Sequence, residues 1–250
     1  RWRQNPGLTA LGDVAGLKEA PTAYHLGFLI GPRVNAGGRV GEASLGAHLL
    51  STNDETQART IAQRLDALNR ERQEIEATVL EEAIECVETT DLLSKPILLV
   101  KGEGWHPGVI GIVASRLKER YGRPSCVISF TDDMGKGSGR SITGIDLGTA
   151  MHTATHNGLL VYGGGHAMAA GFTVIRENYD KFYEFLLARL GSEMKNILPT
   201  IELDASITLN GITTDFLQSL NCLEPFGAGN PTPKFMIQNV RISYAEVFGK

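Results

Sequence analysis

The pattern of hydrophobic and polar positions changes period along this chain. Between Asp54 and about Glu88, apolar residues recur at helical spacing among Glu, Arg and Gln residues, which predicts one long helix capped by Thr52, Asn53 or Asp54. At 1.5 Å per residue the helix is about 50 Å long, and because most of its faces are polar we expect a strut between two lobes. A coiled-coil dimer helix is the alternative, which the short apolar repeat, broken by Arg72, disfavours.

Downstream, short apolar runs alternate with amphipathic segments, and this alternation predicts an α/β domain over about residues 92–192. The expected elements are strands at Pro96–Lys101, Ser125–Phe130 and Gly171–Ile175, and helices at Val109–Tyr121, Asp146–His156 and Tyr179–Leu190.

The last segment has a third pattern. Ile201–Leu209 and Lys234–Tyr244 are predicted strands, and Thr214–Asn221 is a predicted short helix between them. Pro225–Pro233 is rich in turn residues and predicts a loop. We expect the opening of a β-rich domain that stops in mid-fold at Lys250.

Glycine is the unusual feature of the composition. The 250 residues include 29 glycines, or 11.6%, against about 7% in average proteins. The longest glycine-free stretch runs from Ala47 to Lys101. Such an excess predicts places where the backbone bends tightly or approaches another group closely. The apolar share of 42% excludes an intrinsically disordered chain.

The net charge of −4 conceals a segregation, because residues 53–91 carry −7 and residues 92–192 carry +3. An anion site is therefore compatible with the overall sign. No apolar run is long enough for a membrane span, no signal peptide is recognisable, and Cys86, Cys126 and Cys222 are too scattered for a zinc site or a disulfide framework. We expect a cytoplasmic protein and, because the chain opens on Arg1 rather than Met, a fragment of a longer one.

Two glycine-containing segments could hold an anion at their polar side chains. GPRVNAGGRVG, at 31–41, predicts a loop that presents Arg33, Asn35 and Arg39 to a phosphate or carboxylate, or a domain-closing loop with arginine salt bridges. GEGWHPGVIGIVASRL, at 102–117, predicts a strand-to-helix junction whose free N–H groups suit an anion. There Trp105 and His106 either face a ligand or serve packing and capping.

Two further segments are rich in glycine. GKGSGRS, at 135–141, predicts a phosphate-cradling loop that presents Lys136, Ser138 and Arg140, or a plain hairpin turn. YGGGHAMAAG, at 162–171, predicts a triple-glycine turn that holds His166 toward a ligand, although a lone histidine is often structural.

Metal-binding patterns are missing. His152 and His156 stand one helical turn apart but lack a third ligand, so we interpret them as structural, and the Asp132–Asp133 pair is interpreted as a solvated turn. No nucleophile or metal-hydrolase motif occurs, so the segments indicate anion binding without a chemical engine.

Together the four segments resemble the DHH/DHHA1 phosphoesterase superfamily, and within it the bacterial RecJ family of exonucleases specific for single-stranded DNA. GPRVNAGGR resembles the motif that closes the catalytic DHH domain, whereas GWHPGVIGIVASRL, SGRS and GGGHAMAAG resemble successive DHHA1 signatures. LEPFGAGNPTPKF, at 223–235, resembles the start of the OB-type domain of RecJ. The resemblance implies the end of a DHH domain at 1–52, a connecting helix at 53–91, a DHHA1 substrate-binding domain at 92–192 and a partial OB-type nucleic-acid-binding domain at 193–250.

The resemblance also implies an activity, which is 5′-to-3′ degradation of single-stranded DNA with two Mg²⁺ or Mn²⁺ ions in DNA repair and recombination. The family's metal ligands lie in Asp and His motifs that do not occur in this chain, so we expect it to bind no metal and to be inactive alone. The implied partners are single-stranded DNA, a single-strand-binding protein and a recombination helicase, with no membrane and a monomeric state.

The resemblance assigns roles to matched positions. His166 contacts the reacting phosphate and is the one catalytic candidate, while Trp105 or His106 stacks on a base or lines a pocket for the 5′ end. The remaining assignments are contacts to the phosphate backbone, made by Arg33, Asn35, Arg39, Ser138, Gly139, Arg140, Ser141, Gly164 and Gly165.

Two alternative functions remain. One is a phosphodiesterase for short oligonucleotides or cyclic dinucleotides, which the PFGAGNPTP segment disfavours. The other is a non-catalytic RecJ-like binding module, for which the missing metal motifs would be natural.

Overall fold

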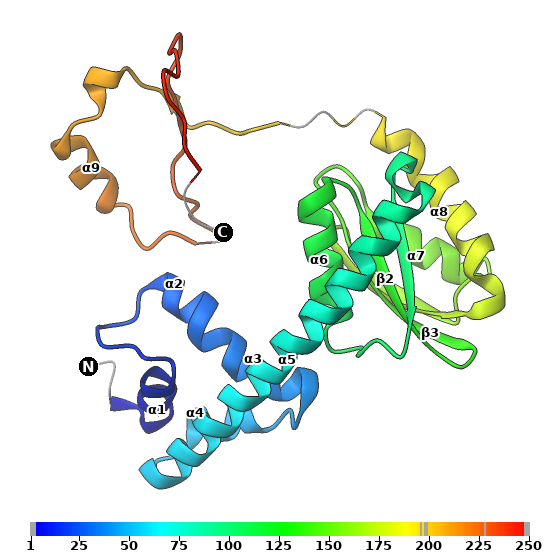
Figure 1. Cartoon of the computed structure of the whole chain (residues 1–250), viewed down its shortest axis with the longest axis horizontal. Coiled ribbons are helices and arrows are strands. Elements are labelled where there is room, and N and C mark those ends of the chain that lie inside the picture. Colours follow the sequence, from blue (N-terminus) through cyan, green and yellow to red (C-terminus); the bar gives the residue numbers. More distant parts are fainter. Residues whose placement is uncertain (1–3, 196, 198–199, 228, 248–250) are drawn as a thin grey trace. The chain divides into compact units, whose positions relative to one another are not determined.

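The computed structural model describes residues 4–195, 197, 200–227 and 229–247 (Figure 1). It divides into two compact units. The larger comprises residues 1–20 and 28–197, and the smaller comprises residues 21–27 and 198–250. None of the described helices combines the length and the apolar composition that a bilayer span requires.

The larger unit begins with a helical lobe. Helices α1 (Pro6–Val14), α3 (Gly31–Val40) and α4 (Leu45–Ser51) pack against the first half of α5 (Glu55–Thr89). A π-helical turn at Leu26–Ile30 precedes α3. The lobe has its own hydrophobic core, which includes Leu11, Leu49, Leu65 and Leu68.

Helix α3 corrects the loop predicted for residues 31–41. Pro32 lies in its first turn, where the missing N–H costs nothing. The glycines permit close packing on α5, because a Cβ on Gly41 would lie 2.8 Å from a methyl carbon of Leu68. A Cβ on Gly37 would lie 2.5 Å from the carbonyl oxygen of Glu42. Tertiary packing thus offsets the poor helix propensity of glycine.

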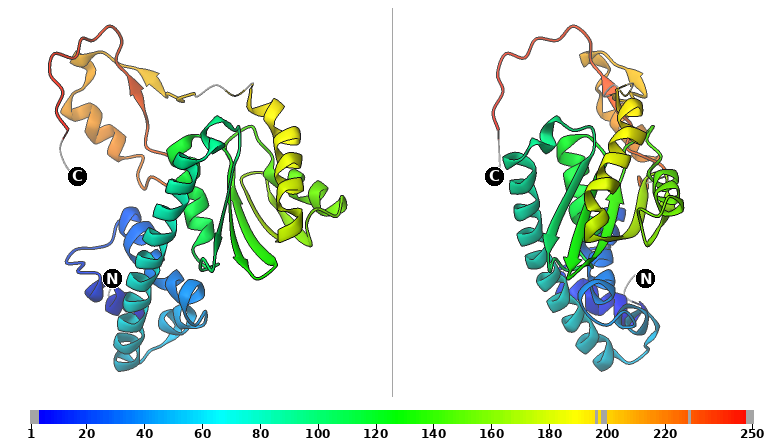
Figure 2. Two further views of the ribbon diagram at one scale, coloured as in Figure 1. Left: turned by 45° about the vertical axis from the view of Figure 1, so that its right-hand side comes forward. Right: turned by 90° about the vertical axis from the view of Figure 1, so that its right-hand side faces the viewer.

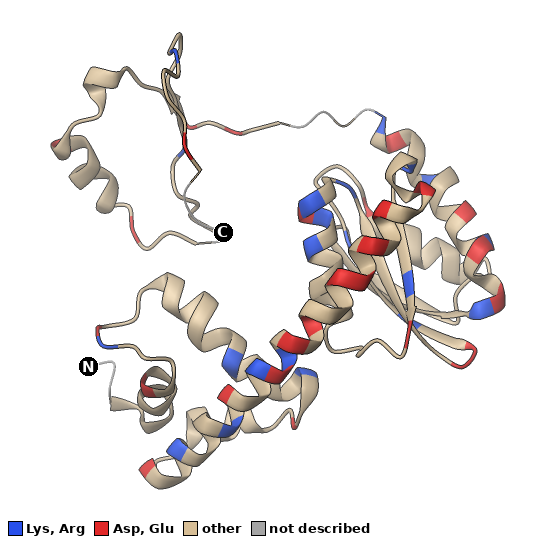
Figure 3. Ribbon diagram, viewed as in Figure 1, with Lys and Arg blue, Asp and Glu red and all other residues tan. Residues whose placement is uncertain are grey.

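Helix α5 confirms the predicted long helix, and its 35 residues begin directly after Asp54, whose carboxylate accepts hydrogen bonds from the N–H groups of Thr56 and Gln57. It runs from the helical lobe to the α/β lobe (Figure 2). Its apolar positions are buried within the chain in both lobes, which fits the predicted strut. Acidic side chains gather along its second half (Figure 3).

The α/β lobe is built on a five-stranded sheet in the order β1-β2-β3-β5-β4, in which β1 and β2 are parallel and the other pairs antiparallel. Helices α5 and α6 cover one face over β1 and β2, and helices α7 and α8 cover the other face (Figures 1 and 2). The strands are β1 (Leu98–Glu103), β2 (Ser125–Thr131), β3 (Met134–Arg140), β4 (Tyr162–His166) and β5 (Ala169–Ile175), and the helices are α6 (Ile110–Tyr121), α7 (Leu147–His156) and α8 (Tyr179–Met194), with short 3-10 turns at Asp91–Ser94 and Arg176–Asn178.

The predicted helices of this lobe are confirmed, and the strands differ in extent. The first strand begins two residues later than predicted and the last begins two residues earlier. Asp146 caps α7 by accepting a hydrogen bond from the N–H of Thr149. This polar residue in the sequence therefore marks the start of the helix.

Strand β3 corrects the loop predicted for residues 135–141. Its glycines face the core, where larger side chains would collide with their neighbours. A Cβ on Gly137 would lie 2.2 Å from ring carbons of Phe172, and one on Gly139 would lie 2.6 Å from a methyl carbon of Leu147. The alternation of glycine with polar residues is therefore the two-residue period of a strand.

Strand β4 likewise replaces the predicted triple-glycine turn. Gly163, Gly164 and Gly165 are paired with β5, and the turn lies beyond His166 instead. Gly165 has φ of +152°, and a Cβ there would lie 2.3 Å from the carbonyl oxygen of Ala169. Only glycine fits this position, so at Gly165 the motif serves a close approach within the sheet.

In the smaller unit the helix α9 (Thr214–Asn221) confirms the prediction, whereas the two long strands are wrong. Among the described residues of this unit, the strands are β6 (Ala205–Ser206) and β7 (Phe235–Met236), which form a parallel pair. The flanking apolar residues remain exposed, and Ile242 is 78% exposed. Longer strands would therefore gain no stabilisation from burying these side chains against the described residues. The unit also contains α2 (Ala23–His25) and a 3-10 turn at Leu209–Gly211.

Residues 225–233 confirm the predicted loop as far as they are described, with one isolated bridge between Gly227 and Asn230. Residue 228 lies outside the described residues.

Candidate nucleic-acid interface

One half of a sheet face is left open beside α6. Residues that pair directly across antiparallel strands point to the same face, and β3, β5 and β4 place three rows there. The rows are Arg140–Ala169–His166, Ser138–Gly171–Gly164 and Lys136–Thr173–Tyr162. In the middle row Gly171 is exposed, and a Cβ on it would meet nothing within 4 Å.

Arg140 is the half-buried cation of this face. Its Nη1 donates to the Oγ of Ser138 at 3.1 Å and to the carbonyl oxygen of Gly139 at 2.8 Å. Burial lowers the pKa of the Arg140 guanidinium from its ordinary value, and the neighbouring charge of Arg39 lowers it further. Within the described part of the chain, no carboxylate forms an ion pair with either arginine.

The first turn of α6 lies directly against this guanidinium. A Cβ on Gly111 would lie 3.0 Å from Nη2 of Arg140 and 3.0 Å from Oγ of Ser138. The N–H groups of Ile110 and Gly111 have no acceptor among the described residues. A helix N-terminus carries partial positive charge, so the positive end of the α6 dipole lies next to the positive charge of Arg140. Such an arrangement suits an anion.

Arg39 brings the end of α3 to the same place. Its Nη1 donates to the carbonyl oxygen of Gly108 at 3.1 Å, and a Cβ on Gly108 would lie 2.1 Å from the carbonyl oxygen of Arg39. The two lobes of the larger unit therefore touch beside Arg140. The structure brings together Arg39, the start of α6 and Arg140, which the sequence had predicted in three separate motifs.

Arg33 and Asn35, from the motif at 31–41, lie in different surroundings: Arg33 is partly buried and Asn35 is exposed. The Nε of Arg33 lies 2.8 Å from Oδ1 of Asp66 on α5, and its Nη1 donates to the carbonyl oxygen of Leu29 at 2.8 Å. The side chain of Arg33 is only 16% exposed and contributes to helix packing, and its predicted phosphate contact stays a prediction. Asn35 is exposed on α3, one helical turn before Arg39.

Trp105 and His106 follow the packing and capping interpretation. Trp105 is 7% exposed in the core under α6, and its Nε1 donates to a carboxylate oxygen of Glu82 at 2.7 Å. It therefore offers no face to a base, which corrects the expected stacking. The Nδ1 of His106 accepts a hydrogen bond from the N–H of Gly108 at 3.0 Å and so braces the turn before α6.

The members of the SGRS motif point in different directions. Ser138 and Arg140 face the open side, whereas Gly139 faces the core. The buried Oγ of Ser141 donates to the carbonyl oxygen of Ile145 at 2.8 Å. Gly139 contributes its carbonyl oxygen to hold Arg140, so two of the four predicted phosphate contacts become positioning residues.

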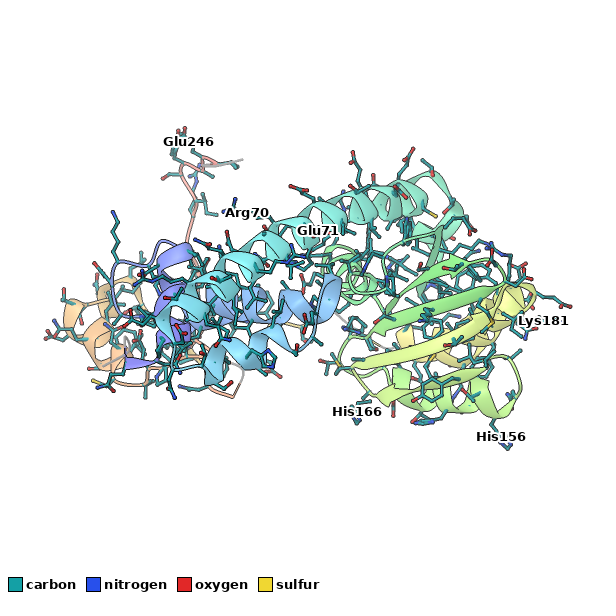
Figure 4. All side chains as sticks on the ribbon, turned by 90° about the horizontal axis from the view of Figure 1, so that it is seen from below. Arg70, Glu71, His156, His166, Lys181 and Glu246 are labelled. Carbon is teal, nitrogen blue, oxygen red and sulfur yellow. The ribbon has the colours of Figure 1, made fainter. Side chains whose placement is uncertain are left out.

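His166 ends β4 in register with Arg140 on the open face. It is exposed and points away from the sheet edge, as Figure 4 shows. His152 lies near Gly164, where a Cβ would be 3.5 Å from a ring carbon of the histidine, whereas His156 projects elsewhere (Figure 4). Both histidines of this helix are exposed, so neither is a core residue.

Among the described residues, no three His, Cys, Asp or Glu side chains come together as a divalent-metal site requires. The groups that gather on the open face are arginine side chains and helix N–H groups, which bind anions.

Comparison with known proteins matches two regions of the chain to family models. The model of the DHHA1 domain matches residues 94–192, and the model of the RecJ OB domain matches residues 203–250. The single-stranded-DNA-specific exonuclease RecJ of Dickeya dadantii is 38% identical over 242 residues, and that of Bacillus subtilis is 37% identical over 236 residues. The chain spans 42% and 29% of their lengths, and the aligned regions cover 92% and 91% of the chain.

Solved structures show the same similarity. RecJ from Thermus thermophilus in complex with Mn²⁺ matches 94% of this chain and 34% of its own, with a TM-score of 0.80 and 31% identity. A second structure, of exonuclease RecJ bound to manganese, matches 77% of this chain and 48% of its own, with a TM-score of 0.65 and 31% identity.

Proposed function

Because the chain belongs to the RecJ family of single-stranded-DNA-specific exonucleases, we propose that its open sheet face binds the phosphate backbone of single-stranded DNA. The observation that carries this proposal is the group formed by Arg39, Arg140 and the start of α6, which has no carboxylate partner in the described structure. Phosphate contacts position a strand without reading its sequence, which suits an exonuclease that accepts any base.

The roles within the proposed interface follow from exposure. Arg140, braced by Ser138 and by the carbonyl of Gly139, holds one phosphate together with the N–H groups of the first α6 turn. Arg39 and Asn35 extend this contact from the helical lobe. His166 and the backbone of Gly164 contact the phosphate nearest the reacting bond.

For the whole protein we propose 5′-to-3′ exonuclease activity in DNA repair and recombination. The Mg²⁺ or Mn²⁺ ions for this activity would be bound by a part of the protein outside the 250 residues of this chain. Residues 1–52 would then end a DHH domain, 53–91 connect it to a DHHA1 domain at 92–192, and 193–250 belong to an OB-type domain. A cytoplasmic monomer that works with a single-strand-binding protein and a recombination helicase completes this proposal.

The test is the salt dependence of oligonucleotide binding. Each phosphate neutralised on a single strand contributes a slope of about −0.7 to a plot of log affinity against log salt concentration. Arg140→Ala should weaken binding uniformly across sequences. It should also make the slope less negative by about 0.7, which is the contribution of one phosphate. Arg189→Ala is the matched control, because it removes the same charge from the exposed surface of α8, where Arg189 pairs with Glu193. Equal slopes for the two variants would refute the proposed interface.

A further inference from the structure

A row of small residues, Ser138–Gly171–Gly164, crosses the open face, and its two glycines lie side by side in register. We call it the glycine row. No atom lies within 4 Å of a Cβ position on the exposed Gly171, so the row is open to solvent at that residue. The rows that flank it end on β4 with Tyr162 on one side and His166 on the other.

Tyr162 lies beside the glycine row. The residue is 67% exposed, and its hydroxyl oxygen lies 4.0 Å from the Cβ position of Gly164, so the ring leans along the strand toward that glycine. His152 approaches Gly164 from α7, with a ring carbon at 3.5 Å, so the open part of the row lies at Gly171. An exposed aromatic ring next to open backbone leaves room for a planar group to stack.

Each flanking row begins with a cation on β3, which is Arg140 in the row that ends in His166 and Lys136 in the row that ends in Tyr162. Tyr162 and His166 stand four positions apart on β4, or roughly 13 Å at the rise of a β-strand. One nucleotide does not reach that far, so a phosphate held by Arg140 and a base stacked on Tyr162 would belong to different nucleotides of one strand.

We propose that Tyr162 and the glycine row form a nucleobase subsite in which Tyr162 stacks on one base of the bound single strand. The inference rests on the proposed function and adds a contact of a different kind, because stacking involves no phosphate. Every base has a π-face, so such a subsite accepts any sequence.

The experiment combines protein variants with abasic DNA. Affinity is measured by fluorescence anisotropy for an oligothymidylate of about 12 nucleotides, within the range of single-strand site sizes, and for the same strand with one abasic nucleotide moved along it. Tyr162→Ala should weaken binding of the intact strand about tenfold without changing the salt slope. Tyr162→Phe, which keeps the ring, should bind as the natural protein does.

The abasic series isolates the stack. At one position, or two adjacent ones, the missing base should weaken binding to the natural protein as much as Tyr162→Ala does, and the variant should show no added loss there. Leu93→Ala, at a residue that is 46% exposed in the 3-10 turn after α5, should leave every affinity unchanged.

Two results would overturn the subsite. One is unchanged affinity for Tyr162→Ala, and the other is a loss that adds fully to the abasic loss at every position. If Arg140→Ala weakens binding while Tyr162→Ala does not, the stacking inference fails and the phosphate interface stands. If the natural protein binds no oligonucleotide, both fail.

Discussion

Gly111→Ala separates anion binding from folding in one substitution. A Cβ at this position would lie 3.0 Å from Nη2 of Arg140 and 3.0 Å from Oγ of Ser138, and ordinary contacts between non-bonded heavy atoms lie at about 3.5–4.0 Å. The guanidinium is the movable end of a flexible side chain, so it should shift by several tenths of an ångström. The methyl group also crowds the N–H groups of the first α6 turn.

The magnitudes follow from these contacts. A hydrogen bond to a charged group contributes about 1.5–3 kcal/mol, and a loss of about 1.4 kcal/mol lowers affinity tenfold. We therefore expect Gly111→Ala to weaken single-stranded DNA binding about tenfold. Alanine favours helix over glycine by up to about 1 kcal/mol, so the free energy of unfolding should stay the same or rise.

The assay pairs anisotropy titrations with urea unfolding followed by circular dichroism. Gly191→Ala is the matched control, because its Cβ would lie 3.5 Å from Cγ of Pro96, an ordinary contact on the helix α8. It should share any gain in stability and keep the natural affinity. Natural affinity for Gly111→Ala would refute the idea that the first turn of α6 and Arg140 share one phosphate.

Two further substitutions test the packing. Gly137→Ala should lower the free energy of unfolding by about 1–3 kcal/mol, because its Cβ would lie 2.2 Å from ring carbons of Phe172; an unchanged urea midpoint would contradict the core-facing glycine row. Arg33→Ala should lower that free energy by about 1–3 kcal/mol, since it leaves the 9% exposed carboxylate of Asp66 with fewer partners, and it should leave DNA affinity unchanged in anisotropy titrations. A tenfold loss of affinity would return Arg33 to the interface.

The sequence predicted the helices where local signals and apolar periodicity agree. Asp54 and Asp146 cap α5 and α7 with hydrogen bonds to nearby N–H groups, and the apolar positions of α5 repeat at helical spacing. These signals lie within a few residues of the structure they specify, so a single sequence suffices to find them.

Strand β3 and helix α3 were missed because their glycines depend on distant neighbours. Gly137 faces Phe172 across the core, and Gly37 of α3 faces Leu65 of α5. Glycine contributes no hydrophobic signal, so the two-residue period of β3 was visible only in its polar half. Tertiary contacts decided both elements against their local propensity.

The site was predicted in parts. The Arg39 and Arg140 motifs each indicated an anion, but only the fold shows that both meet the first turn of α6. Trp105 was ambiguous because its partner, Glu82, belongs to a helix that precedes it in the chain. The sequence did not indicate Tyr162 as a binding residue, because its proposed role depends on the strand register that places Gly164 and Gly171 next to it.

The measurement that tests the central claim most directly is a ¹⁵N NMR titration of this 27.0 kDa chain with oligothymidylate, which observes the Nε–H of Arg140 as well as the backbone. The account predicts that the Arg140 side-chain resonance and the amides of Gly111 and Gly171 shift together, in proportion to bound DNA, and that salt reverses the shifts. Saturating DNA that leaves these three signals in place while signals of α8 move would contradict it.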